Sequence, residues 1–235
     1  MTDKLTFLIT GSSRGLGRGL AEHYADGGHR VFGCSRGPSD FAHENYQHMT
    51  ADIGAEADVR ALFREIKAAG GQIDVLVNNA GASLSRYALL TTAEEADQIL
   101  RTNLLGAFMV MREAIKHMKR KRHGRIINFT SISVPLGSSG RAIYSASKAA
   151  LENLAFTVSG ELVGEDITVN TIGPSIIAGS GMVEELGEAA LEQARAKLLK
   201  PDAIDVAEVA HAIDFFAAAE ARNITNQTVY FGGLK

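Results

Sequence analysis

The sequence is poor in cysteine, in excess charge of either sign and in long apolar runs, and each shortage excludes a class of protein. The single cysteine, Cys34, cannot form an internal disulfide, and its apolar surroundings predict a buried, unreactive thiol in a reducing compartment. With 24 Lys and Arg against 27 Asp and Glu, the net charge of −3 offers no broad basic field for a nucleic acid. No apolar stretch approaches the length of a membrane span, and no signal peptide is expected. We therefore expect a cytoplasmic protein without nucleic-acid, membrane or metal partners.

Apolar runs and helical patterns alternate along the chain. At 235 residues and 46% hydrophobic composition, the sequence is sufficient for one α/β domain with a sizeable core. The expected strands are residues 5–10 and 30–35, a weak third strand that residues 50–53 follow, and residues 73–77, 125–130, 167–172 and 227–231. The expected helices run from the glycine turn to about residue 26, from near 55, over 93–117, over 142–163 and from 205. This alternation predicts a single-domain Rossmann fold over residues 1–235, a doubly wound, seven-stranded parallel sheet with helices on both faces.

Tyr144 and Lys148 lie four residues apart in an expected helix and so share one face of it. A tyrosine with an ordinary pKa of about 10 exchanges protons poorly near neutral pH, and a nearby cation favours the phenolate and lowers that pKa. Ser131 follows the strand over 125–130, where its hydroxyl is placed to bond the same substrate oxygen as the phenol. These three residues predict a proton-transfer site.

A glycine-rich turn from Gly11 to Gly17 joins the first strand to the first helix, as in sites that bind phosphate at a helix N-terminus. The second strand ends in Ser35 and Arg36, without the acidic residue that holds a ribose 2′-hydroxyl in dinucleotide-binding folds. Arg14, in the glycine turn, is a second cation. The alternative interpretation is that Arg14 and Arg36 are two exposed surface arginines that bind no phosphate. Because a basic residue at this strand end accepts a 2′-phosphate, we favour NADP(H) over NAD(H).

Four further features belong to this predicted site. Asn78 to Gly81 end the fourth strand with small and amide side chains that leave room for a flat cofactor. Asp52 either accepts a hydrogen bond from adenine or caps the helix that begins near residue 55. Asn103 lies among apolar neighbours and must be hydrogen-bonded, either as a structural pin or as part of a water relay. Residues 175–200 lie beyond the sixth strand, where we expect a substrate loop or lid.

Taken together, these motifs resemble the short-chain dehydrogenase/reductase family over essentially the whole chain, and its 3-oxoacyl-carrier-protein reductases in particular. The resemblance rests on Thr10 to Gly17, Asn78 to Gly81, Asn103, Ser131, and Tyr144 with Lys148.

The resemblance implies hydride transfer between a nicotinamide and a carbonyl or alcohol carbon, in the direction of reduction with NADPH. Tyr144 would protonate the carbonyl oxygen, which Ser131 would hold. Lys148 would lower the pKa of the phenol and bond the nicotinamide ribose, and Asn103 would keep a water that links Lys148 to solvent.

The remaining contacts and the assembly are also expectations. Cofactor contacts are expected from Gly11, Ser12, Ser13, Arg14, Gly15, Leu16, Gly17, Ser35, Arg36, Asp52, Ile53, Asn79, Ala80, Gly81, Tyr144, Lys148, Pro174 and Ile177. Substrate contacts are expected from Ser83, Ser131, Ser133, Tyr144 and Met182. The family also implies a homodimer or homotetramer, formed through the helices over 93–117 and 142–163.

Two departures from the family pattern concern the lid and the substrate. The usual Pro-Gly after the sixth strand, with Thr four residues on, is replaced by Pro174-Ser175 and Gly179. Glu165 and Asp166 stand where carrier-protein reductases often have a basic residue, and acids there would repel an acidic carrier. This favours a small free carbonyl compound as substrate, with a carrier-bound one as the alternative.

Two alternatives of other classes are a catalytically idle NADP-binding protein and an epimerase or dehydratase with tightly bound NAD. The intact Ser131, Tyr144 and Lys148 argue against the first. The short chain, Arg14 and Arg36 argue against the second.

Overall fold

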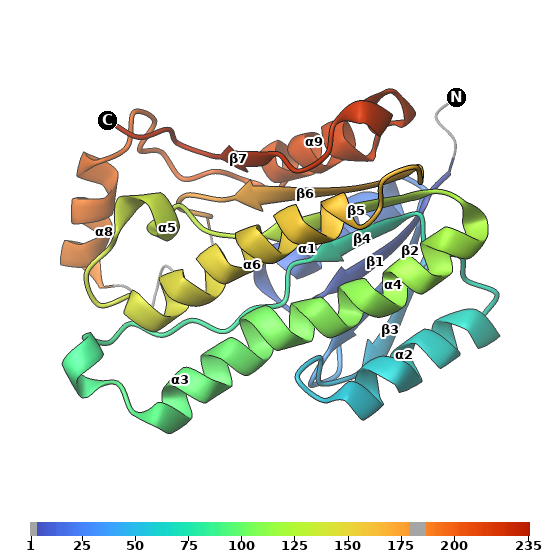
Figure 1. Cartoon of the computed structure of the whole chain (residues 1–235), viewed down its shortest axis with the longest axis horizontal. Coiled ribbons are helices and arrows are strands. Elements are labelled where there is room, and N and C mark those ends of the chain that lie inside the picture. The colour runs from blue at the N-terminus through green and yellow to red at the C-terminus, as the bar shows by residue number, and fades with distance from the viewer. Residues whose placement is uncertain (1–3, 179–186) are drawn as a thin grey trace.

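A seven-stranded sheet forms the middle layer of the protein, whose computed structural model describes residues 4–178 and 187–235 (Figure 1). All its neighbouring strands are parallel, in the order β3-β2-β1-β4-β5-β6-β7. The strands are β1 Thr6–Thr10, β2 Arg30–Ser35, β3 Tyr46–Thr50, β4 Val75–Asn78, β5 Gly124–Phe129, β6 Ile167–Gly173 and β7 Thr228–Tyr230. The chain moves outward from β1 to β3 and returns to β4 on the other side of β1. Ligands of such sheets bind where the order reverses, outside the carboxyl ends of the strands.

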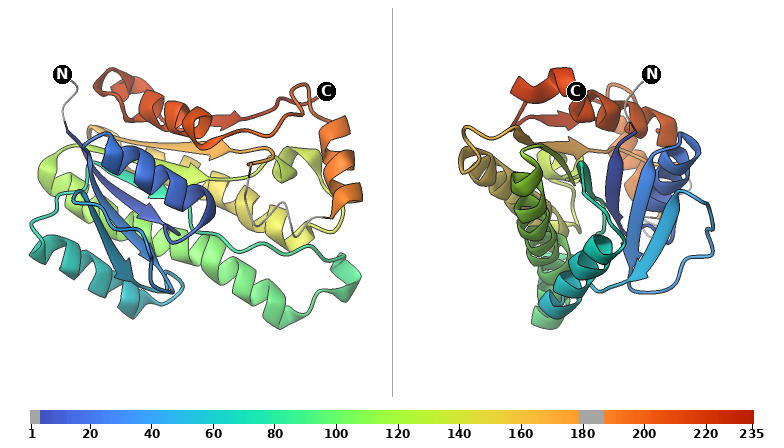
Figure 2. Two further views of the ribbon diagram at one scale, coloured as in Figure 1. Left: turned by 180° about the vertical axis from the view of Figure 1, so that it is seen from behind. Right: turned by 90° about the vertical axis from the view of Figure 1, so that its right-hand side faces the viewer.

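Helices cover both faces of the sheet, as the sequence predicts (Figure 2). One hydrophobic cluster lies under α2, α4 and α6, and a second lies under α1 and α9. The α-helices are α1 Gly15–Asp26, α2 Glu56–Ala68, α3 Ala93–Leu100, α4 Ala107–Lys121, α5 Ser133–Leu136, α6 Ala142–Gly160, α8 Glu188–Ala196 and α9 Val206–Ala217. Two short 3₁₀ turns, η1 Ala88–Leu90 and η3 Ala219–Asn223, also lie among the described residues. None of the described helices has the length and apolar character needed to cross a membrane.

The helical run after β4 is continuous but not uniform. It begins at α3 with a capping box, in which Thr92 Oγ1 accepts from the Glu95 amide and Glu95 accepts from the Thr92 amide. A π-helical turn, Arg101–Gly106, joins α3 to α4 and contains Asn103. Such turns are rare and concentrate at functional sites. The single helix predicted over 93–117 is therefore three segments that end at Lys121.

One other boundary differs from the sequence-based prediction, and one agrees with it. The weak third strand expected before residues 50–53 is the edge strand β3, Tyr46–Thr50. Ala51 and Ile53 are buried in the turn that leads into α2. The helix predicted over 142–163 ends at Gly160.

Candidate active site

The motifs singled out in the sequence lie at one edge of the sheet. The glycine turn follows β1, Arg36 follows β2, Asn79 follows β4 and Ser131 follows β5, and these strands are parallel neighbours. Their carboxyl ends therefore share an edge. Helix α6 brings Tyr144 and Lys148 to the same region, since Lys148 bonds the last residue of β5.

Lys148 is buried at the end of β5. Its side chain is 3% exposed, and Nζ donates a 2.7 Å hydrogen bond to the carbonyl oxygen of Phe129. Burial lowers its pKa from 10.5 to about 8, because the protein interior disfavours the charged form. Gly81 faces the same amine, and a Cβ at that position would lie 3.4 Å from Nζ. The amine thus lies between the end of β5 and the loop after β4.

Asn103 ties that loop to α6. Its Oδ1 accepts from the Ala82 amide at 2.7 Å, and its Nδ2 donates to the Ala82 carbonyl and to Ser147 Oγ, both at 3.0 Å. Ser147 Oγ in turn donates to the Tyr144 carbonyl at 2.7 Å. These bonds confirm the structural pin, and the water relay stays a prediction.

Tyr144 is buried beside a second cation. The guanidinium carbon of Arg141 lies 4.0 Å from the centroid of the Tyr144 ring. Arg141 is itself only 5% exposed, and its Nη1 donates to Ser83 Oγ at 2.9 Å. Sequence reasoning missed Arg141: its position three residues before Tyr144 is a signal for contact with the ring, but not for burial of the arginine. The contact also places Ser83, a predicted substrate residue, at this site.

The segment after β5 contacts the start of α6. Ser131 Oγ accepts from the Ser133 amide at 3.2 Å. Ser145 Oγ, next to Tyr144 in sequence, donates to the carbonyl and hydroxyl oxygens of Ser133 at 3.3 and 3.2 Å. Ser131 and Ser133 therefore lie on a segment that is fixed to the helix of Tyr144.

The glycine turn is held by a neighbouring strand end. Asn79 Nδ2 donates to the Thr10 carbonyl at 2.8 Å, and the Ala80 amide donates to Thr10 Oγ1 at 3.0 Å. A Cβ on Gly17 would lie 2.3 Å from the Gly11 carbonyl oxygen, so only glycine fits there. Gly15 has a φ of +56° and no atom within 4 Å of its Cβ position, which leaves open space beside the turn. Arg14, the N-cap of α1, makes no side-chain capping bond. The first amides of α1 are thus available to an anion.

Arg14 and Arg36 are exposed at the ends of β1 and β2, which are adjacent in the sheet. Within the described part of the chain, neither forms an ion pair with a carboxylate. The neighbouring serines behave differently. The hydroxyl of Ser12 bonds Tyr46 Oη at 3.0 Å, and that of Ser35 donates to the Gly37 carbonyl at 2.8 Å. Their hydroxyls shape the turns, and the two arginines are the groups that face outward.

The remaining predicted residues divide between backbone support and core. Asp52 Oδ1 accepts from the Gly54 amide at 2.9 Å, which caps the turn before α2, whose N-cap is Ala55. The Pro174 carbonyl accepts from the Ile132 amide at 3.0 Å. Three predicted contacts pack in or near the interior, namely Leu16, Ile53 and Ile177. Ser13 is half-buried on the glycine turn.

Part of the expected lid at 175–200 is described. Met182, Gly179 and the rest of 179–186 lie outside the described residues. Helix α8 follows, and Leu191 and Leu198 pack with Ile132 and Ile176 in a small apolar cluster. The second half of the segment is thereby anchored to the chain that follows β5 and β6.

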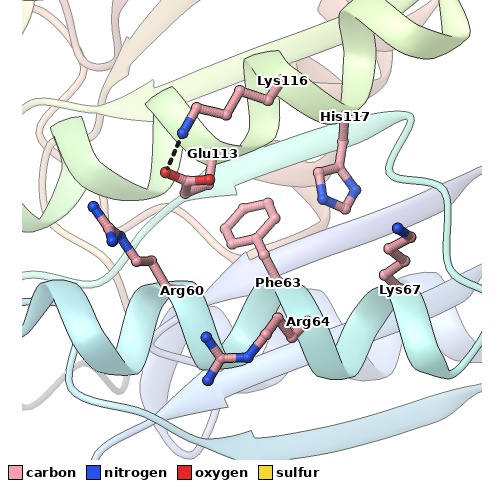
Figure 3. Close-up of a pocket in the computed structure, with 7 residues that line it drawn as sticks. All are labelled: Arg60, Phe63, Arg64, Lys67, Glu113, Lys116 and His117. Atoms are coloured by element: carbon pink, nitrogen blue, oxygen red, sulfur yellow. Dashed lines mark hydrogen bonds and ion pairs between the residues drawn. The ribbon is translucent and has the colours of Figure 1, made fainter.

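Two hollows on the surface lie outside this constellation. One, of about 440 Å³, lies between α2 and α4, and Figure 3 shows its cationic rim of arginine and lysine side chains around Phe63. Its lining residues are Arg60, Phe63, Arg64, Lys67, Glu113, Lys116 and His117. The other, of about 340 Å³, lies between Tyr87 and the start of α6. Neither is lined by Tyr144 or Lys148, so neither is the catalytic centre.

Comparison with protein families gives one match that covers most of the chain. The sequence profile of the short chain dehydrogenase family matches residues 5–191. The 3-oxoacyl-[acyl-carrier-protein] reductase FabG of Escherichia coli (strain K12) is 32% identical over 232 residues, which cover 96% of this chain and 95% of that one.

Solved structures give the same answer for the fold. A protein assigned as a gluconate dehydrogenase from Agrobacterium tumefaciens superposes with a TM-score of 0.89 at 27% identity, over 97% of this chain and 94% of that one. ElxO with NADP bound superposes with a TM-score of 0.88 at 27% identity, over 97% of both chains.

Proposed function

The chain belongs to the short-chain dehydrogenase family and is an NAD(P)-dependent oxidoreductase of CH–OH and C=O groups, and on this premise we propose that it is an NADPH-dependent reductase of small free carbonyl compounds. The observation that carries the proposal is the pair of outward-facing arginines, Arg14 and Arg36, at the ends of the adjacent strands β1 and β2. A 2′-phosphate is recognised at this place in dinucleotide-binding folds. The NADP held by the similar ElxO structure supports the same choice.

The residues present fit such a cofactor. The open space beside Gly15 and the uncapped amides of α1 suit a pyrophosphate, and Arg14 and Arg36 suit the 2′-phosphate. Lys148, at the other end of this edge, is the donor for the hydroxyls of the nicotinamide ribose. The chemistry supplied by bound NADPH is a hydride for the carbonyl carbon of the substrate.

The chain's own residues supply the proton. Tyr144 donates its phenolic proton to the carbonyl oxygen as that oxygen gains negative charge, and the Ser131 hydroxyl holds the same oxygen. Lys148 keeps positive charge near the phenol, and the Phe129 carbonyl fixes its amine in place. Asn103 joins the loop of Gly81 and Ala82 to α6, so both sides of the site keep their spacing.

A free substrate is favoured over a carrier-bound one by the charges before β6. Glu165 lies 3.6 Å from the Lys119 amine, and Asp166 pairs with His123 at 2.8 Å and with Arg125 at 3.0 Å. These two acids thus neutralise the nearby cations that an acidic carrier protein would need for binding. Reduction of a carrier-bound 3-oxoacyl group, the activity named for the Escherichia coli relative, is the second candidate.

The first experiment compares the dissociation constants of NADPH and NADH. We expect at least a tenfold preference for NADPH, about 1.4 kcal/mol, and its loss in Arg36→Ala. Arg60→Ala is the matched control, since this exposed arginine on α2 pairs with Glu56 and lies away from the turn. A preference for NADH would overturn the cofactor assignment.

A second measurement tests the chemistry. Tyr144→Phe should bind NADPH normally and reduce ketones at least 100-fold more slowly, because general acid catalysis contributes about that much. Full activity in this variant would favour a catalytically idle role for the tyrosine.

A further inference from the structure

Arg141 is a buried cation in the candidate active site that the proposed reaction does not use. It is the N-cap residue of α6, yet its side chain does not cap that helix. It lies against the face of the Tyr144 ring, and its Nη1 donates to Ser83 Oγ. Both partners are uncharged, so the positive charge of Arg141 needs another explanation.

The other buried arginine shows what a structural role looks like. Arg125 is 1% exposed, and its Nη1 donates to Asp166 Oδ1 at 3.0 Å and to two backbone carbonyls. Arg141 is 5% exposed, and no carboxylate of residues 4–178 or 187–235 forms an ion pair with it. Burying a charge is costly unless it is paired. Stacking on an aromatic ring offsets part of that cost for a guanidinium but leaves most of its donors unused.

The position of Arg141 limits which chemical group can pair with its guanidinium. A guanidinium has five N–H donors in a planar fork, and Ser83 is the one hydrogen-bond acceptor that the described residues supply. A carboxylate fits the remaining N–H donors, because its two oxygens accept two parallel hydrogen bonds of about 2.8 Å from a guanidinium. The guanidinium carbon lies 4.0 Å from the ring that carries the proton-donating hydroxyl. In a substrate whose anionic group is bound there, a short carbon chain would be enough to link that group to the reacting carbonyl.

We propose that Arg141 binds the carboxylate of the substrate, which makes the protein a reductase of short oxo acids. The inference rests on the proposed function for the reaction itself and adds the substrate class. Arg141 contacts the acid group, Ser83 orients the guanidinium, and Tyr144 protonates the ketone of the same molecule.

The test compares acids with their uncharged esters. NADPH oxidation is measured with acetoacetate and levulinate and with the methyl ester of each. In the wild-type protein, kcat/KM for an acid should exceed that for its ester at least tenfold. Arg141→Gln should abolish this preference, chiefly by raising KM for the acid, and Arg141→Lys should retain part of it.

Arg86→Gln is the matched control, because Arg86 lies in the loop after β4 but is half-exposed and pairs with Glu95 at 3.0 Å. It should leave the preference for acids unchanged. Equal losses for acid and ester in Arg141→Gln would show that Arg141 merely supports the Tyr144 ring, and would overturn the inference. An ester preference in the wild-type protein would overturn it as well.

A binding measurement separates this inference from the proposed reaction. The NADPH complex is titrated calorimetrically with isobutyrate and with isobutyramide. Isobutyrate should bind at least tenfold more tightly than the amide, and Arg141→Gln should remove the difference. Binding of this kind without turnover of any ketone would count against the proposed reaction alone. Equal or absent binding of the two compounds would overturn the role of Arg141.

Discussion

The buried position of Lys148 suits catalysis but lowers the stability of the folded protein. Its ordinary pKa of 10.5 falls to about 8 in the folded protein because the amine is buried. The unfolded chain therefore binds more protons than the folded one between pH 8 and 10.5, and the free energy of unfolding rises with pH across that window. Below pH 8 both states carry the ammonium, and the full cost of burying the charge remains.

Lys148→Met should consequently be inactive and more stable than the wild-type protein at pH 7. Removing the buried charge relieves about 3 kcal/mol by the change in pKa, and leaving the Phe129 carbonyl without its donor costs about 1–3 kcal/mol. We expect a net gain of about 1 kcal/mol in urea denaturation at pH 7, falling toward zero or below at pH 10. Lys116→Met, an exposed control paired with Glu113, should change little at either pH. A loss of stability at pH 7 would contradict this account.

At the scale of residues, spacing in the sequence identified Tyr144 and Lys148 at the centre of the site but did not identify Arg141 at its edge. Tyr144 and Lys148 are a helical pair, and the structure places both in the interior at the end of β5. Arg141 was missed because a cation at a helix start is ordinarily exposed. Its burial depends on Ser83, which is 58 residues earlier in the chain. No local pattern encodes that contact.

At the scale of elements, the turn between β1 and α1 depends on a third element. Asn79, from the end of β4, bonds the backbone of the turn, and Gly17 is packed against both partners. The glycines of the turn were predictable from the sequence, whereas the role of Asn79 as their support required the strand order. The π-helical turn at Asn103 was likewise hidden, because its apolar residues continue the pattern of a regular helix.

Gly17→Ala should weaken both this turn and the binding of NADPH. The new Cβ would lie 2.3 Å from the Gly11 carbonyl oxygen and 2.4 Å from Asn79 Nδ2, and both groups are fixed. Overpacking of this kind costs about 1–3 kcal/mol of stability, and we expect at least a tenfold rise in the dissociation constant of NADPH. Chemical denaturation and fluorescence titration measure the two effects.

Gly160→Ala is the control for that substitution. Gly160 is the last residue of α6, and no atom outside the helix lies within 4 Å of its Cβ position. Alanine should stabilise the helix by up to about 1 kcal/mol and leave NADPH binding unchanged. Normal NADPH binding by Gly17→Ala would mean that the turn has more freedom than its contacts imply.

At the scale of the whole molecule, exposed aromatic rings mark the layer formed by α4 and α6. Phe156 on α6 is 59% exposed and Phe108 on α4 is 37% exposed, although both helices bury their opposite faces against the sheet (Figure 1). Met111, three residues after Phe108 on α4, lies in the core. Sequence periodicity cannot separate core from interface residues, because both are apolar at helical spacing.

These rings predict that two copies of the chain associate through α4 and α6. A carboxylate at a desolvated interface is strongly unfavourable, so Phe156→Glu should halve the molar mass measured by light scattering after size-exclusion chromatography. Phe215 lies on α9, on the other face of the sheet, and is 54% exposed. The Phe215→Glu variant distinguishes a dimer from a tetramer. It should leave a dimer intact but convert a tetramer to dimers, since a tetramer needs a second surface. If the α4 and α6 layer is not an interface, Phe156→Glu will leave the mass unchanged.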